Sequence, residues 1–272
     1  MNDQAGDGVF RYRDGIAVAQ VVYFFVALLA ACYFRWTRRI GWFCIGVLAI
    51  FRLVGAGCML GTIHNDTDGL WAGVFVCESL GVLLAIFLLL EILERINKVV
   101  PVARRWVFIV PQVVTWIDIG ISIAGFVVVK QKDHGQLLPT PYSRAGIAIL
   151  FAIYLWMAGT FVFFWLRRAN YPVVEHRAVR CVGVCVPILA IRVVYSLIFV
   201  ITADMTWNAV KGDSTAYLVM TMLPEVAIVA ITGVVIMQMP PLGRRKGVEV
   251  SDESNDRPDK YGTRRSESIP LV

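Results

Sequence analysis

The sequence predicts an all-α membrane protein, a polytopic bundle of seven transmembrane helices. Of its 272 residues, 58% are hydrophobic, and the mean hydropathy is +0.67. Charged residues make up only 17%, against about 25% in soluble domains. A soluble protein of this length cannot bury so much apolar surface, so lipid must cover the excess.

Apolar stretches of the right length supply the seven helices. A helix needs about 20 mostly apolar residues to cross the hydrocarbon layer. Seven stretches qualify: Ile16–Phe34, Ile40–Ile63, Leu70–Leu90, Trp106–Val129, Ala145–Leu166, Cys181–Ala203 and Thr215–Met237. The runs are continuous, whereas a β-barrel would give short segments of alternating hydrophobicity.

The placement of basic residues predicts the orientation of the spans. Arginines and lysines gather after spans one, three, five and seven, whereas the connection His64–Gly69 has none. Positive charge stays on the cytosolic side, so the N-terminus is expected to be lumenal or outside and the C-terminus cytosolic. The net charge of +6 is then explained by topology, and we expect no nucleic-acid partner. Asn65 begins an N-glycosylation sequon on the predicted lumenal side.

The chain divides into three parts. Residues 1–15 form a short lumenal N-terminus, and the first span is read as a retained helix, not a removed signal peptide. Residues 16–239 form the seven-helix transmembrane domain. Residues 240–272 begin with two prolines and are rich in charged residues and serine, which predicts a disordered cytosolic tail.

Five ionisable residues lie within the predicted spans. They are Arg52, Glu78, Asp118, Arg192 and Glu225. A charge at the bilayer centre costs at least about 2.5–3.5 kcal/mol, so these side chains are expected to face the bundle interior. Ionisable groups in that position are candidates for function.

Four of the five are expected to form two pairs. Arg52 and Glu78 lie on consecutive antiparallel spans, and so do Arg192 and Glu225. These pairs either hold the bundle together or position the carboxylates for chemistry; both interpretations stay open. Buried pairs often contribute specificity more than net stability.

Asp118 has no basic residue at its depth on the neighbouring spans. An unpaired carboxyl group in a dry interior tends to stay protonated, which is the state required of a proton donor. The alternative is a neutral Asp hydrogen-bonded to a neighbouring helix. Trp116 on the same span and Tyr195 near Arg192 are candidates to line a shared cavity, since aromatic faces stabilise cations; the alternative is ordinary packing.

The sequence lacks the motifs of nucleotide and metal sites. There is no Walker loop, no GxGxxG and no HExxH, and all three histidines lie in or near predicted connections. The six cysteines lie inside apolar spans and are read as packing residues. We expect no metal and no cofactor.

Four short motifs carry a resemblance to a known family. They begin at Phe51-Arg-Leu-Val-Gly, Glu78-Ser-Leu-Gly-Val, Ile191-Arg-Val-Val-Tyr and Met222-Leu-Pro-Glu-Val. Over residues 10–240 the chain resembles a fungal family of seven-helix membrane proteins of unknown function. That family is distantly similar to lipid-translocating exporters. The chain also looks like membrane-bound terpene cyclases of fungal meroterpenoid pathways, of the ascochlorin and macrophorin types.

The resemblance implies a metal-independent terpene cyclase of secondary metabolism. Such an enzyme protonates and cyclises the prenyl chain, of epoxyfarnesyl type, on a hydrophobic aromatic intermediate. Cyclisation requires an acid, a dry cavity and a final base. Asp118 is the expected acid, with Glu78 or Glu225 as the alternative acid or the base. Arg52 and Arg192 would orient the carboxylates, and Tyr195 and Trp116 would line the cavity.

Two other functions stay open. The chain could be a transporter or stress-response protein similar to the lipid-translocating exporters, with the same charges lining a path, or a seven-helix receptor. The bilayer is the expected environment in each case. The endoplasmic reticulum is expected for a biosynthetic enzyme.

Overall fold

The computed structural model describes residues 8–65, 67–132, 141–168, 171–172, 175–202, 204–208 and 212–239. Within these ranges the chain is helical and contains no strand. The first seven residues and the predicted tail from Pro240 lie outside the described residues.

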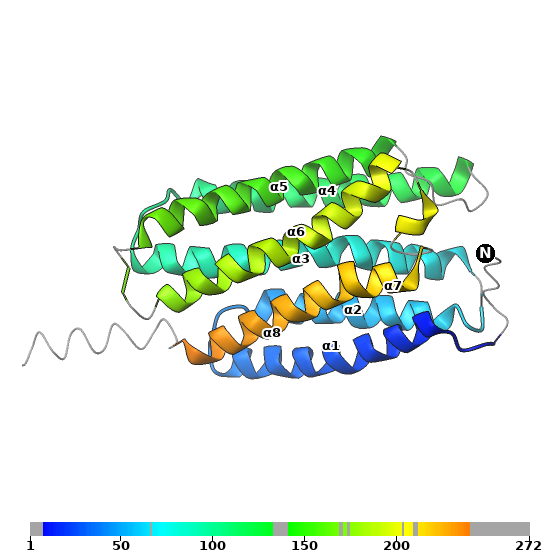
Figure 1. Cartoon of the computed structure of the whole chain (residues 1–272), viewed down its shortest axis with the longest axis horizontal. Helices are drawn as coiled ribbons and strands as arrows, with labels where there is room; N and C mark the ends of the chain where they lie inside the picture. Colours follow the sequence, from blue (N-terminus) through cyan, green and yellow to red (C-terminus); the bar gives the residue numbers. More distant parts are fainter. Residues whose placement is uncertain are drawn as a thin grey trace, which may run out of the picture. The chain divides into compact units, whose positions relative to one another are not determined.

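The predicted spans correspond to helices in chain order (Figure 1). These are α1 (Tyr12–Trp36), α2 (Trp42–Gly61), α3 (Asp68–Val99), α4 (Trp106–Lys132), α5 (Pro141–Leu166), α6 (His176–Thr202) and a last run from Ser214 to Gln238. The last run consists of α7 (Ser214–Tyr217), the π-helical turn η3 (Leu218–Met222) and α8 (Leu223–Gln238). A short 3-10 turn, η2 (Met205–Trp207), precedes it.

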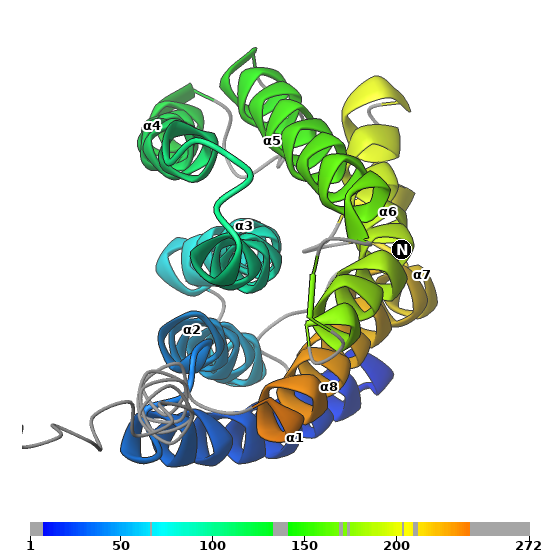
Figure 2. The same cartoon turned by 90° about the vertical axis from the view of Figure 1, so that its left-hand side faces the viewer.

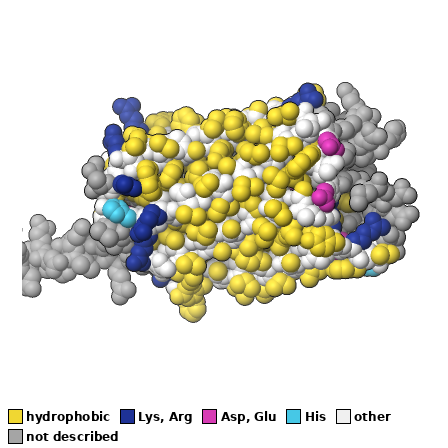
Figure 3. Space-filling model, in the orientation of Figure 1, with side chains coloured by type: hydrophobic (Ala, Val, Ile, Leu, Met, Phe, Trp, Pro, Cys, Tyr) yellow, Lys and Arg dark blue, Asp and Glu magenta, His cyan; other side chains and the backbone are white. Residues whose placement is uncertain are grey.

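The described helices are those of a multi-pass membrane protein. Six are long and apolar enough to cross a bilayer, and α4 adds a shorter apolar stretch, Trp106–Ile121. On the face shown in Figure 3, hydrophobic side chains cover the middle of the surface. Most of the visible Lys and Arg lie toward one end, and the visible Asp and Glu lie toward the other end, where a few Lys or Arg also lie. Exposed apolar area on this scale needs a partner, and lipid is the partner that fits helices of this length.

Helix α3 lies at the centre of the bundle (Figure 2). It contacts α2, α4, α5, α6 and α8. In its most apolar window 67% of residues are buried, against 28–44% in the other five long helices. A side chain on α3 can therefore meet side chains from several other helices.

Helices α2 and α3 approach each other closely through small residues. A Cβ on Gly55 would lie 2.9 Å from Cys77 Cβ, and one on Gly73 would lie 2.8 Å from Cys58 Sγ. Gly57, which has the GxxxG spacing with Gly61, has no atom within 4 Å of the same position. The close contact thus uses Gly55 on α2 and Gly73 on α3. Of the GxxxG pair, Gly61 contacts α3, where a Cβ would lie 3.3 Å from the Leu70 side chain.

The connection between α1 and α2 is fixed by Gly41 and Arg39. Gly41 has a φ of 77°, a left-handed conformation that glycine adopts without strain, and its N–H donates to Glu91 Oε1 at 2.9 Å. Arg39 Nη1 donates to the carbonyls of Ile236 and Met239 at 2.8 and 3.0 Å. A cation at this point stabilises the C-terminal end of α8.

Arg95 is placed differently from the sequence expectation. Helix α3 continues nine residues beyond Leu90, and Arg95 is a buried helical residue, not a charge in the connection between spans. Its Nε lies 3.6 Å from Oε2 of the buried Glu175. The predicted span ends too early because a hydropathy scale treats every arginine as solvated, whereas Arg95 is buried and paired.

Pro224 is the second residue of α8, two residues after the π-helical turn ends. Pro224 has no N–H to donate to the carbonyl four residues earlier, and the turn before it is widened so that Leu223 N–H reaches the carbonyl of Leu218. Wide turns of this kind are rare and often lie at functional sites. Glu225 is the next residue along the chain.

Candidate functional site

Four of the five predicted intramembrane charges meet at one place. Arg52 comes from α2, Glu78 from α3, Arg192 from α6 and Glu225 from the first turn of α8. All four side chains are at most 9% exposed. They are called the charge network below.

Both predicted ion pairs are present, and further ion pairs connect the two. Arg52 Nη1 lies 2.5 Å from Glu78 Oε1, and Arg192 Nε lies 3.5 Å from Glu225 Oε1. In addition, Arg52 Nη2 binds Glu225 Oε1, and Arg192 Nη2 lies 3.1 Å from Glu78 Oε2. Two guanidinium groups thus bridge two carboxylates, and the formal charges balance.

The bridging geometry ties four helices together. Arg192 Nη2 also donates to the main-chain carbonyl of Glu78 at 3.3 Å. Charge-assisted hydrogen bonds of this kind are the strong ones, and guanidinium groups can bind carboxylates through two nitrogens at once. Removing one member would leave its partners charged, buried and incompletely paired.

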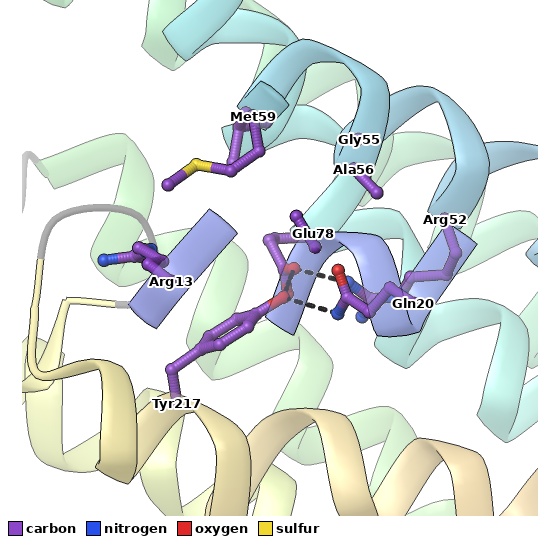
Figure 4. A pocket seen from close by; sticks show the side chains of 10 residues that line it. Arg13, Gln20, Arg52, Gly55, Ala56, Met59, Glu78 and Tyr217 are labelled. Carbon is purple, nitrogen blue, oxygen red and sulfur yellow. Dashed lines mark hydrogen bonds and ion pairs between the residues drawn. The ribbon is translucent and has the colours of Figure 1, made fainter. Parts of the chain in front are cut away.

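Two residues that the sequence reasoning missed extend the network. The Tyr217 hydroxyl donates to Glu78 Oε1, and Gln20 Nε2 donates to the Tyr217 hydroxyl at 2.8 Å (Figure 4). Gln20 lies mid-way along the first span, where a buried amide is a usable signal. Tyr217 lies eight residues before Glu225, close to the same helix face. Its role depends on the π-helical turn, which the sequence pattern does not predict.

Gly81 provides the space for Arg52. A Cβ at Gly81 would lie 2.4 Å from Arg52 Nη2 and 2.8 Å from Arg52 Cζ. The guanidinium therefore packs directly on the backbone of α3, one turn from Glu78. A larger residue at this position would push Arg52 away from both carboxylates.

A small cavity adjoins the charge network. Its volume is about 20 Å³, room for about one water molecule. Polar groups of Arg13, Gln20, Arg52, Glu78 and Tyr217 line one part of it. The rest of the lining is apolar or glycine: Ala17, Gly55, Ala56, Met59 and Val74. Arg13 and Met59 mark the end of the bundle where α1 begins and α2 ends (Figure 4).

Asp118 is separate from the charge network. Its side chain is 3% exposed, on a helix that contacts α3 and α5. Its Oδ1 has no hydrogen-bond partner among the described residues. Thr115, one turn earlier and also buried, donates instead to the carbonyl of Pro111 at 2.9 Å.

The two predicted aromatic residues lie in opposite settings. Tyr195 is fully buried, with its ring centroid 6.0 Å from Arg192 Cζ and 6.0 Å from the Trp207 ring. Trp116 is 73% exposed, so its side chain faces outward from α4. The expectation that Trp116 lines an interior cavity with Tyr195 was therefore wrong: hydropathy alone does not give the face of an apolar helix.

Asn65 lies exposed in the connection between α2 and α3, as a glycosylation site requires. In the described part of the chain, no three His, Cys, Asp or Glu side chains gather in a way that could hold a metal ion. Candidates for contact with a ligand among the described residues include the charge network with Tyr217 and Gln20, and Asp118.

Comparison with known proteins places the chain in a family. No curated protein and no solved structure matches the sequence significantly. A family model described as a domain of unknown function, DUF7702, matches residues 10–240. That match covers the seven predicted spans, and the chain belongs to the DUF7702 family.

Proposed function

We propose that the protein is a membrane-bound terpene cyclase that cyclises the prenyl chain of a meroterpenoid intermediate by acid–base chemistry. The observation that carries the proposal is the cavity beside Glu78, where a carboxylate, a phenol and a guanidinium converge with apolar side chains inside a membrane bundle. The cavity itself has room for about one water molecule, so a prenyl chain would have to displace side chains that line it. A prenylated substrate would reach this interior from the bilayer.

The buried carboxyl groups fall into two environments that suit opposite roles. Glu78 and Glu225 each lie beside two guanidinium groups, which hold their carboxyl oxygens in place, and Glu78 also lines the cavity, the position required of a base. Asp118 is buried, and its Oδ1 has no partner in the described residues, which favours the protonated form required of an acid. Carboxyl groups held in such different environments can divide acid and base chemistry between them.

In the proposed reaction, Asp118 protonates an epoxide or terminal alkene of the prenyl chain. The carbocation closes the rings, and a network carboxylate, Glu78 for preference because it lines the cavity, removes the final proton. Arg52 and Arg192 hold the carboxylates in place. The product has the same mass as the substrate.

The proposed orientation puts the N-terminus in the lumen or outside and the C-terminus in the cytosol, in the endoplasmic reticulum membrane. The gathering of Lys and Arg at one end of the bundle (Figure 3) supports it through the positive-inside tendency. That end is where α1 ends and α2 begins. Asn65, exposed at the other end of α2, would then be glycosylated.

The proposal is tested by turnover. Microsomes from a heterologous host that expresses the full chain are given an aryl compound that carries an epoxyfarnesyl chain. We expect a cyclised isomer of unchanged mass, resolved by liquid chromatography and mass spectrometry and absent from microsomes of the empty host. If the protein accumulates normally but the substrate stays open-chain with every aryl head group tested, the result would count against the cyclase and favour lipid transport.

A further inference from the structure

Two buried hydroxyl groups beside the charge network have no hydrogen-bond partner among the described residues. They are the Tyr195 hydroxyl and Thr221 Oγ1, and both residues are 0% exposed. Burying a hydroxyl without a hydrogen-bond partner is unfavourable, because the group loses its bonds to water. A native structure that keeps such groups calls for an explanation.

Thr221 differs from other threonines in the described helices. The hydroxyl groups of Thr115, Thr160, Thr202 and Thr232 each donate to the carbonyl four residues earlier, at 2.6–2.9 Å. That partner is available to any threonine in a regular α-helix. Thr221 lies in the π-helical turn η3 and does not use it. The widened turn thus leaves this hydroxyl free to bind another group.

Tyr195 and Thr221 lie at the same level of the bundle. Arg192 on α6 contacts Glu225 on α8, and the two helices run in opposite directions (Figure 1). Tyr195 lies one turn after Arg192, and Thr221 lies one turn before Glu225. Both therefore lie about one turn beyond this pair, toward the same end. Helix α6 and η3 contact each other.

The Tyr195 side chain lies inside the bundle, beside the charge network. It is 0% exposed, and Arg192 Cζ lies 6.0 Å from its ring centroid. The Trp207 ring packs against the Tyr195 ring at 6.0 Å between centroids.

We infer that the hydroxyl groups of Tyr195 and Thr221 form a binding site for a neutral oxygen atom of an apolar ligand, a carbonyl or ether oxygen on an aromatic head group. Both hydroxyls can donate, and such an oxygen accepts. The charge network is formally neutral, so an ionic ligand would add an uncompensated buried charge. The inference takes the ligand class from the proposed function and supplies the residues that would hold the head group, away from Asp118.

The test measures binding and stability separately. Wild type, Tyr195→Phe and Thr221→Val are purified in detergent, and unfolding is followed with a thiol-reactive dye, since Cys77, Cys181 and Cys185 are buried. The probes are a farnesyl benzaldehyde and the matched farnesyl toluene, which lacks the oxygen. Without a probe, both variants should be as stable as wild type or more stable, because each loses an unsatisfied group.

With the carbonyl probe, the apparent Kd should rise about tenfold for each lost hydroxyl, and the toluene probe should bind all three proteins alike. Thr232→Val is the matched control. Its hydroxyl donates to the carbonyl of Ile228, so it should bind both probes as wild type does.

Equal affinity of wild type and both variants for the carbonyl probe would overturn the inference, and so would equal affinity of wild type for the two probes. Either result would mean that these hydroxyl groups hydrogen-bond only with water and not with a ligand. If the variants lose affinity for the carbonyl probe while wild type forms no cyclised product, the site stands and the cyclase proposal fails. If wild type cyclises its substrate and both variants keep its KM, the site fails alone.

Discussion

Arg52, on α2, is held in the interior of the bundle by contacts with α3 and α8. It binds both glutamates of the charge network and packs on Gly81. Its cost in a dry interior is offset only while both carboxylates stay in reach. Single substitutions around it should therefore have large and specific effects.

Gly81→Ala should destabilise the protein by about 1–3 kcal/mol, because its Cβ would lie 2.4 Å from Arg52 Nη2. Thermal unfolding in detergent measures the change. Gly57→Ala on α2 is the control: no atom lies within 4 Å of its Cβ position, and alanine favours a helix over glycine by up to about 1 kcal/mol. A Gly81→Ala protein as stable as the Gly57→Ala protein would contradict the packing of Arg52.

The charge balance of the network makes a second prediction. Arg192→Gln and Glu225→Gln should each cost about 3–5 kcal/mol, since each leaves the buried network with one uncompensated charge. The double variant restores neutrality and should cost clearly less than the sum of the two. A double-mutant cycle of unfolding free energies measures this coupling. Strict additivity of the two losses would mean that the pair does not interact.

At the scale of single elements, the sequence predicts the helices well and their exposed and buried faces poorly. Hydropathy places a helix at each expected span, and the position of Arg52 and Glu78 on consecutive antiparallel spans predicts their pair. It does not show that the two pairs merge, because that depends on how α6 and α8 pack on α3. It also places Trp116 inside, although α4 turns that side chain outward.

The π-helical turn is an element that the sequence patterns do not predict. It sets the rotation between Tyr217 and Glu225, which both bind within the charge network. Helices are read from a period of 3.6 residues, and a single wide turn shifts that period over a few residues only. Pro224 marks the place without revealing the geometry.

Insertion of one alanine after Val219 should break the contact between Tyr217 and Glu78. The turn is already widened by one residue, so a further residue rotates the preceding chain by about 100° relative to α8, which turns the Tyr217 hydroxyl away from α3. We expect a lower unfolding temperature and no further loss when Tyr217→Phe is added to the insertion. Val219→Ala is the control, because Val219 is 53% exposed and the register is kept. If Tyr217→Phe destabilises the protein with the insertion as much as it does wild type, the turn has no such role.

At the scale of the whole molecule, the apolar outer surface and the basic end of the bundle define how the chain lies in a membrane. The seven expected spans are all found as helices, although Arg95 is buried and no longer counts toward the charge of the connection after α3. The orientation then depends on the remaining arginines at that end (Figure 3).

The orientation is measured by glycosylation at Asn65. The full chain expressed in a eukaryotic host should migrate faster after treatment with an N-glycosidase, and Asn65→Gln should remove the shift. A second variant, expressed in the same host, carries a sequon in the connection between α1 and α2. This sequon should not be glycosylated. Modification of that variant, with Asn65 unmodified, would show the reverse orientation.

Acid–base cyclisation inside the bundle is the central claim, and turnover by Asp118→Asn tests it most directly. The carboxamide keeps the shape of the side chain and cannot give up a proton as an acid. Thr115→Val, one turn away on α4 and equally buried, is the control. In microsomes supplied with the epoxyfarnesyl-aryl substrate, we predict cyclised product from wild type and Thr115→Val and none from Asp118→Asn at equal protein levels. Turnover by Asp118→Asn at the rate of wild type would contradict the account.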